Sequence, residues 1–137
     1  MKTPTLALLI QIAGLLHIGL IAAGVAMPRA VNLRPQIAGL APFVRQLFWV
    51  YYSFIGLCLV SFGIISFALA RPLAEGSPLA RGICIFLTAF WTLRLIAATF
   101  VFDVTPYLTK PALRAGYHCT SIVFVYLPIV YLLAALK

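Results

Sequence analysis

The chain consists of four long apolar runs separated by short segments that contain proline and basic residues. The runs extend from Leu6 to Ala26, from about Leu47 to Ala70, from about Gly82 to Phe102 and from about Ala115 to Leu136. At ~1.5 Å per residue, each run is long enough as a helix to cross a hydrocarbon core of ~30 Å. Because lipid offers no partner for backbone polar groups, the pattern predicts four transmembrane helices.

The segments between the runs carry the prolines expected of turns, namely Pro28, Pro35, Pro42, Pro72, Pro78, Pro106 and Pro111. Because these connections are short, consecutive helices should run antiparallel and pack together. We therefore expect an all-α fold, an integral membrane four-helix antiparallel bundle, with residues 1–137 forming one transmembrane domain. A signal peptide is the alternative for the first run, since Lys2 precedes it, but the run exceeds the ~7–15 apolar residues of a typical signal and favours a retained helix.

The composition agrees with lipid as the main solvent. Hydrophobic residues make up 64% of the chain and charged residues 9%, whereas soluble domains are about 25% charged. The cysteines Cys58, Cys84 and Cys119 lie in three different runs without a paired short spacing. This spacing argues against a disulfide framework or a zinc site.

The formal net charge of +8 is divided between both sides of the predicted bundle. The side of the termini carries Lys2, Arg71, Arg81 and Lys137, and the opposite side carries Arg29, Arg34, Arg45, Lys110 and Arg114. Four basic residues against five do not set the orientation by the positive-inside rule, and the usual insertion of helical hairpins favours both termini in the cytoplasm. Basic residues on both sides suit contact with anionic head groups, so membrane lipids are the expected partners, and no motif indicates a nucleic acid.

Arg94 is the most informative residue of the third run. It lies at about the midpoint of that run, where an arginine costs ~2.5–3.5 kcal/mol on insertion scales. We expect it either to face the bundle interior and bind a carboxylate, phosphate or carbonyl of a ligand or partner subunit, or to stack on Trp91. The alternative is an internal lock, in which helix carbonyls or a tyrosine bind Arg94.

Asp103 is one of only two acids and the nearest to Arg94 in the sequence. Nine residues place the two on opposite faces of a continuous helix, ~13 Å apart along its axis, so an intrahelical ion pair is not expected. Asp103 should instead lie at the interface, where it pairs with Lys110 or Arg114 or caps the turn that it begins.

Two histidines are candidates for chemistry. His17 lies near the middle of the first predicted helix with Gln11 on the same broad arc, and it could hydrogen-bond across the bundle, relay a proton, ligate haem iron or serve as a satisfied packing residue. His118 begins the fourth helix. Because His17 is ~8–9 Å deeper, ligation of haem b by both histidines would need shifted helix ends.

Aromatic and small residues complete the pattern of the first two helices. The segment Phe48-Trp49-Val50-Tyr51-Tyr52 is typical of an aromatic belt at the membrane entry, and a contact of Tyr52 with a ligand is the alternative. Gly14 in the first helix and Gly56 and Gly63 in the second lie on stripes of small residues that predict close helix packing. We expect leucine at Gly14 or at Gly56 to wedge the bundle apart.

The chain contains no glycine-rich phosphate loop, His-Glu-x-x-His, Cys-x-x-Cys or acidic pair, so no motif indicates an enzyme. The leading hypothesis is a non-enzymatic multi-pass membrane protein that acts as a subunit of a complex or as a binding module for a lipid- or quinone-sized ligand near Arg94. In that hypothesis Trp91 and His17 line the polar interior, and further subunits or copies of the chain are the protein partners.

Two other classes of function remain open. The first is a haem- or isoprenoid-dependent membrane redox protein or enzyme that uses His17 and His118. The second is a small anion channel or transporter in which Arg94 and the threonine face of the third helix line the path. That face comprises Thr88, Thr92 and Thr99.

Overall fold

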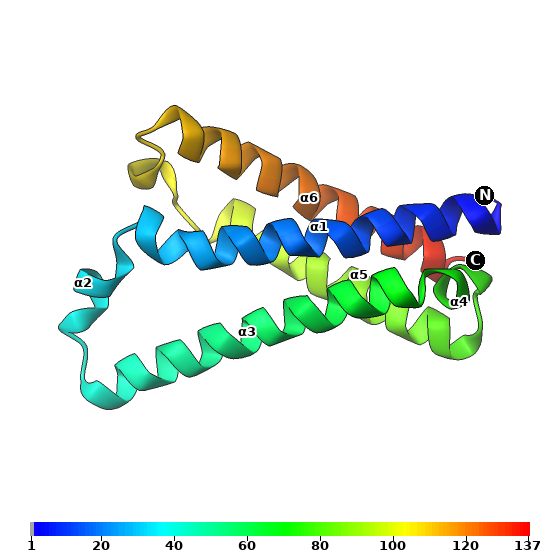
Figure 1. Ribbon diagram of the computed structural model, residues 1–137, viewed down its shortest axis with the longest axis horizontal. Coiled ribbons are helices and arrows are strands. Elements are labelled where there is room, and N and C mark those ends of the chain that lie inside the picture. The colour runs from blue at the N-terminus through cyan, green and yellow to red at the C-terminus, as the bar shows by residue number, and fades with distance from the viewer. Residues whose placement is uncertain (1) are drawn as a thin grey trace.

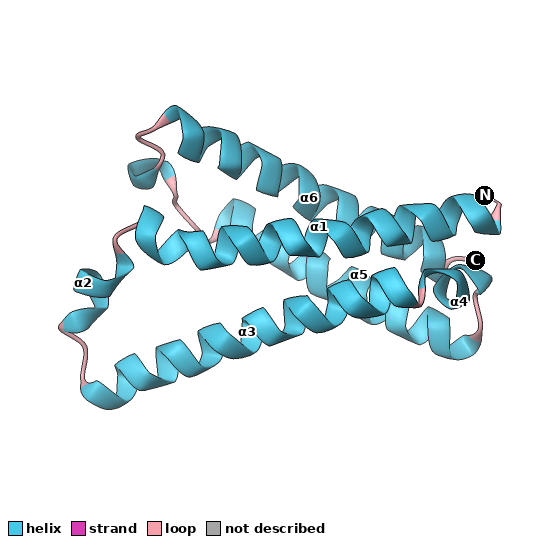
Figure 2. Cartoon of the chain, in the orientation of Figure 1, coloured by secondary structure: helices cyan, strands magenta, loops and turns pink. Residues whose placement is uncertain are grey.

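The computed structural model describes residues 2–137, which fold into helices joined by short connections (Figures 1 and 2). The elements are α1 (Thr3–Ala30), α2 (Leu33–Ala38), α3 (Pro42–Ala68), α4 (Ala70–Glu75), α5 (Pro78–Phe100), the 3-10 helix η1 (Thr105–Tyr107) and α6 (Pro111–Ala135). Within this part of the chain, α1, α3, α5 and α6 are each long and apolar enough to cross a membrane. The prediction of an all-α four-helix bundle is confirmed.

Each long helix begins three to five residues before the boundary expected from hydropathy. A proline occupies the first or second position in all four helices, at Pro4, Pro42, Pro78 and Pro111. Proline suits these positions because the first helical turn leaves its N–H groups without intrahelical partners and the fixed φ of proline matches the helix. Three of these prolines therefore start helices rather than mark the connections before them.

The helices alternate in direction, so the two termini lie at one end of the bundle together with α4, and α2 and η1 lie at the other (Figure 1). The helix α1 packs against α3, α4 and α6, and α5 packs against α6. At the end with the termini the helices converge, whereas α3 and α6 diverge from α1 toward the end with α2 and η1 (Figure 1). We call these the closed end and the open end.

The segment after α3 differs from the expected loop between Pro72 and Pro78. It forms the short helix α4, in which Ala70, Leu73 and Ala74 are buried. The left-handed Gly76, with φ +78°, then ends α4 and turns the chain toward α5. The helix α4 thus fills the closed end, where it packs against α1.

The contact between α1 and α3 depends on two of the predicted small residues. A Cβ atom added at Gly14 would lie 2.7 Å from the backbone nitrogen of Phe67, and one added at Gly63 would lie 3.1 Å from Cβ of His17. At Gly56, by contrast, no described atom lies within 4 Å of an added Cβ. The expected wedging effect at Gly56 is therefore wrong, because α3 has already diverged from α1 at that level.

Hydrogen bonds of tyrosine hydroxyl groups link α3 to α1 and to α6. Pro28 lies inside α1 and has no N–H to offer the carbonyl of Gly24 one turn earlier. The Tyr52 hydroxyl of α3 donates to that carbonyl. Between α3 and α6, the hydroxyl oxygens of Ser66 and Tyr131 lie 2.6 Å apart and are buried.

Candidate ligand site in the bundle interior

His17 lies at the centre of the bundle, beside the glycine contact between α1 and α3. Its side chain is completely buried, and Nδ1 lies 2.7 Å from the carbonyl oxygen of Ala13. Because a carbonyl oxygen only accepts, Nδ1 must carry the hydrogen of this bond, which leaves Nε2 as the acceptor of a neutral imidazole. Among the described residues, Nε2 has no hydrogen-bond partner.

Trp91 of α5 is 1% exposed and contacts His17 directly. The two ring centroids lie 5.2 Å apart at an interplanar angle of 75°, an edge-to-face arrangement. Phe62 of α3 contacts the same imidazole, with centroids 6.4 Å apart, and Phe124 of α6 packs on Trp91 at 5.7 Å. The indole Nε1 is a donor only, and it too is buried with no partner in the described chain.

Arg94 follows Trp91 by one turn of α5 but does not make the predicted stack on that indole. Its Cζ atom lies 4.9 Å from the ring centroid of Phe124 and 5.4 Å from that of Phe102. The guanidinium Nη1 is buried, and no atom of residues 2–137 forms a hydrogen bond with it. Because α5 begins at Pro78 and ends at Phe100, Arg94 lies five residues, or about 7.5 Å, from the helix midpoint toward the open end, not at the midpoint.

His17 contacts Trp91, and Phe124 contacts both Trp91 and Arg94. We call the buried His17 and Trp91 and the half-buried Arg94 the polar cluster. It holds two unpartnered donors and one unpartnered acceptor. An unpaired buried polar group costs about 1–3 kcal/mol, and more when it is charged. The two rings beside Arg94 offset part of that cost through cation–π attraction, which is about 0.5–2 kcal/mol. The remaining capacity for hydrogen bonding suits a polar head group in an apolar surround.

The acids of the chain lie away from this polar cluster. Glu75 ends α4 at the closed end. Asp103 follows α5, and its Oδ1 accepts a hydrogen bond from the Thr105 backbone N–H at 3.0 Å, as expected of the turn that it begins. Hydrogen bonds from the side chain and then the backbone of Thr105 hold the pKa of Asp103 below its ordinary value. Arg114, an expected partner of Asp103, instead donates from Nε to the Leu108 carbonyl at 2.9 Å.

The other candidate residues are not brought into the polar cluster. Tyr52 bonds Gly24 toward the open end, and Gln11 is half-buried on α1. His118 is exposed on α6 and contacts the neighbouring Tyr117 ring, whereas the ring contacts of His17 are with Phe62 and Trp91. Among residues 2–137, no three His, Cys, Asp or Glu side chains group closely enough to hold a metal ion.

The threonines of α5 do not form an interior path in one copy of the chain. Thr92 and Thr99 are exposed on the outside of the bundle, and Thr88 is half-buried. The hydroxyl groups of Thr88 and Thr99 donate to the carbonyls one turn earlier, of Cys84 and Leu95. These hydroxyl groups are therefore satisfied within their own helix.

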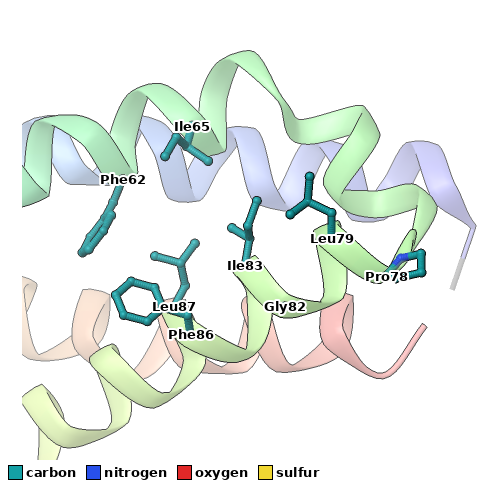
Figure 3. Close-up of a pocket in the computed structure, with 8 residues that line it drawn as sticks. All are labelled: Phe62, Ile65, Pro78, Leu79, Gly82, Ile83, Phe86 and Leu87. Atoms are coloured by element: carbon teal, nitrogen blue, oxygen red, sulfur yellow. The ribbon is translucent and has the colours of Figure 1, made fainter.

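An apolar groove lies between α3 and α5 on the other side of Phe62 (Figure 3). Its volume is about 380 Å³. The lining residues are Phe62, Ile65, Pro78, Leu79, Gly82, Ile83, Phe86 and Leu87. Phe62 therefore separates this groove from His17, since its ring contacts both the imidazole and Phe86.

Sequence reasoning missed the aromatic residues that surround the polar cluster. Phe62, Phe102 and Phe124 lie in apolar runs where nothing in the pattern distinguishes them from lipid-facing phenylalanines. Phe124 lies one turn before Pro128 of α6, and a proline inside a helix leaves the carbonyl of that residue without its usual N–H partner. For Phe62 and Phe102 the sequence offered no such signal.

Four apolar helices with a buried polar cluster between them define a multi-pass α-helical membrane protein. Comparison of the chain with models of protein families, with curated proteins and with solved structures found no match.

Proposed function

We propose that the protein is a non-enzymatic membrane module that binds a lipid- or quinone-sized amphiphile, with the head group of the ligand at His17, Trp91 and Arg94. The observation that carries this proposal is the convergence of three buried, unpartnered polar atoms of the described bundle on side chains linked by contacts, since His17 touches Trp91 and Phe124 touches both Trp91 and Arg94. Buried polar groups in proteins are nearly always satisfied, so such a convergence favours an external partner.

The hydrogen-bonding capacity of the polar cluster indicates the chemistry of the head group. Trp91 Nε1 and Arg94 Nη1 can only donate, so they require acceptor oxygens. His17 Nε2 accepts, and it would pair with a hydroxyl or a protonated head group. A quinone ring is the simplest head group of this kind, because its carbonyls accept in the oxidised form and its hydroxyl groups donate in the reduced form.

The groove between α3 and α5 supports a lipophilic tail. The residues that line the groove are all apolar. The ring of Phe62 contacts both the groove residue Phe86 and the His17 imidazole. A ligand that enters from the bilayer would displace the Phe62 ring to bring its head group to His17. The tail would then remain in the groove.

Native mass spectrometry of the protein in mild detergent tests the proposal. The wild type should retain an amphiphile, and so should the control Thr92→Val, at an exposed neighbour of Arg94. Arg94→Leu should lower this retention at least about tenfold, because one hydrogen bond to a charged group contributes about that factor. Arg94→Leu should keep or raise the thermal stability of the ligand-free protein, because it removes an unpartnered charge. A ligand-free wild type, together with lower stability of Arg94→Leu, would show instead that Arg94 is an internal lock.

A role as a subunit of a membrane complex is the second candidate, and the exposure of α3 favours it. All residues of this helix are described, and Ser66 is the only one that is fully buried. A second copy or another membrane protein could cover the remaining face. Cysteine cross-linking from exposed Leu57 in native membranes would give a discrete larger species if this is correct, and only uncross-linked chain if lipid covers α3.

A further inference from the structure

A second hollow lies at the open end, where the divergence of α1 and α3 leaves a space that α2 bridges (Figure 1). Its volume is about 410 Å³. The hollow is separate from the polar cluster, because its lining residues on α1, Val25 to Arg29, lie eight to twelve residues beyond His17, about 12–18 Å along the helix. An inference about it therefore does not depend on the proposed function.

One part of the hollow is apolar and aromatic. Val25 and Pro28 of α1 face Trp49 and Tyr52 of α3 across it. The hydrogen bond from the Tyr52 hydroxyl to the Gly24 carbonyl joins the two helices beside this part. Tryptophan and tyrosine are the side chains that favour the level where acyl chains meet head groups.

The other part of the hollow is basic. Arg29 and Arg34 both line it, although the end of α1 separates them in the sequence. They are brought together by Asn32, whose left-handed backbone (φ 50°, ψ 50°) turns the chain from α1 into α2. The Gln36 side chain donates to the Val31 carbonyl at 2.6 Å and thereby holds α2 against this turn.

No acid neutralises these arginines within the lining of the hollow, all of which is described. Guanidinium groups bind phosphate oxygens with paired, charge-assisted hydrogen bonds. An apolar aromatic part beside two arginines at the membrane boundary matches the two ends of a phospholipid. We propose that this hollow binds the head group of an anionic phospholipid, with the phosphate at Arg29 and Arg34 and the start of an acyl chain between Val25 and Trp49.

The test is lipid retention measured by native mass spectrometry after reconstitution in mixtures of phosphatidylglycerol and phosphatidylcholine with the same acyl chains. The wild type should retain phosphatidylglycerol preferentially. The double variant Arg29→Gln/Arg34→Gln should lose this preference by at least about tenfold, the factor that one charge-assisted hydrogen bond contributes. The control Arg45→Gln/Lys110→Gln removes the same charge at the same end outside the hollow and should keep the preference.

Two further measurements complete the test. One separates loss of lipid binding from misfolding of the arginine variant, and the other separates a bound phospholipid from a bound free phosphate. Val25→Phe fills the apolar part without changing the charge, and it should lower retention of phosphatidylglycerol even if the arginine variant folds poorly. Inorganic phosphate in excess should not displace the lipid. Equal preference in both double variants, or displacement of the lipid by phosphate alone, would overturn the proposal.

Discussion

Arg94 is set apart from the other basic residues by its surroundings. An arginine at the centre of a membrane helix costs ~2.5–3.5 kcal/mol, which is an upper limit for Arg94 because it lies toward the open end of α5. The rings of Phe124 and Phe102 offset part of this cost. The guanidinium Nη1 is buried and has no hydrogen-bond partner among the described residues. At this scale the unpartnered Nη1 atom is the feature on which the proposed ligand site depends.

The contribution of the aromatic surround to Arg94 can be measured by a double-mutant cycle. Phe124→Leu should destabilise the wild type by about 0.5–2 kcal/mol more than it destabilises the Arg94→Leu variant, because the cation–π contact exists only when both partners are present. Thermal unfolding in detergent gives the four values, and Phe100→Leu, at an 81% exposed residue, is the control. Equal losses in the two backgrounds would contradict the assigned contact.

Asp103 provides a prediction about pH at the open end. Hydrogen bonds from the side chain and backbone of Thr105 lower its pKa in the folded protein. A carboxyl group whose pKa is lowered on folding stabilises the fold above its unfolded pKa, and this contribution is lost as the pH falls through the folded value. The turn should therefore be unchanged at neutral pH and loosen only below about pH 4. A carbon-13 NMR titration of the Asp103 carboxyl should give a pKa below the ordinary one, and a raised pKa would contradict the turn geometry.

Among the helices, the pair α1 and α3 has one close contact and one open region. Gly14→Ala places a Cβ against backbone atoms at 2.7 Å and should destabilise the protein by about 1–3 kcal/mol, as overpacking does. Gly56→Ala meets nothing described within 4 Å and should be neutral or stabilising by up to about 1 kcal/mol, because alanine favours the helix. Thermal stability in detergent compares the two, and equal losses would mean that the helices do not diverge.

The hydrogen bond between Tyr52 and Gly24 predicts a specific coupling between α3 and α1. Tyr52→Phe should cost about 1 kcal/mol, the net value of one such bond, because the Gly24 carbonyl then has no donor from Pro28 or from Tyr52. In a Pro28→Ala background the same change should cost less, since the restored N–H can satisfy that carbonyl. Tyr51→Phe, at an exposed neighbour, serves as the control, and an undiminished loss in the Pro28→Ala background would refute the coupling.

The four spans and their antiparallel order follow from hydropathy, because run length and short connections determine both. The helix starts were displaced, since Pro42, Pro78 and Pro111 act as first-turn residues, a role that hydropathy does not register. The short helix α4 was also missed, because its six residues are too few to show a helical pattern of buried side chains.

The sequence predicted which polar residues belong to the candidate site but not which residues surround them. Arg94, Trp91 and His17 stand out as polar or amphipathic groups inside apolar runs. Which aromatic rings surround them depends on the rotation of α5 and α6 about their axes, and uniformly apolar helices leave that rotation unspecified by pattern alone. For this reason the stack of Arg94 on Trp91 was expected, while the contacts with Phe102 and Phe124 were not.

The whole molecule combines a closed end with an open end (Figure 1). The closed end is held by α4, by the glycine contact and by the buried pair Ser66 and Tyr131. Toward the open end α3 and α6 diverge from α1, and the basic hollow lies between α1 and α3 there. Under the two proposals, the converging helices would fix the frame, and the groove between α3 and α5 and the hollow between α1 and α3 would receive the apolar parts of amphiphiles.

The fluorescence of Trp91 tests the proposed ligand site most directly. Trp49 and Trp91 are the two tryptophans of the chain, so Trp49→Phe leaves one reporter inside the polar cluster. Titration with a short-chain quinone in detergent should quench this reporter in a saturable manner, and Arg94→Leu in the same background should shift the midpoint at least about tenfold. Quenching that rises linearly with quinone and is the same in both proteins would contradict a ligand site at His17, Trp91 and Arg94.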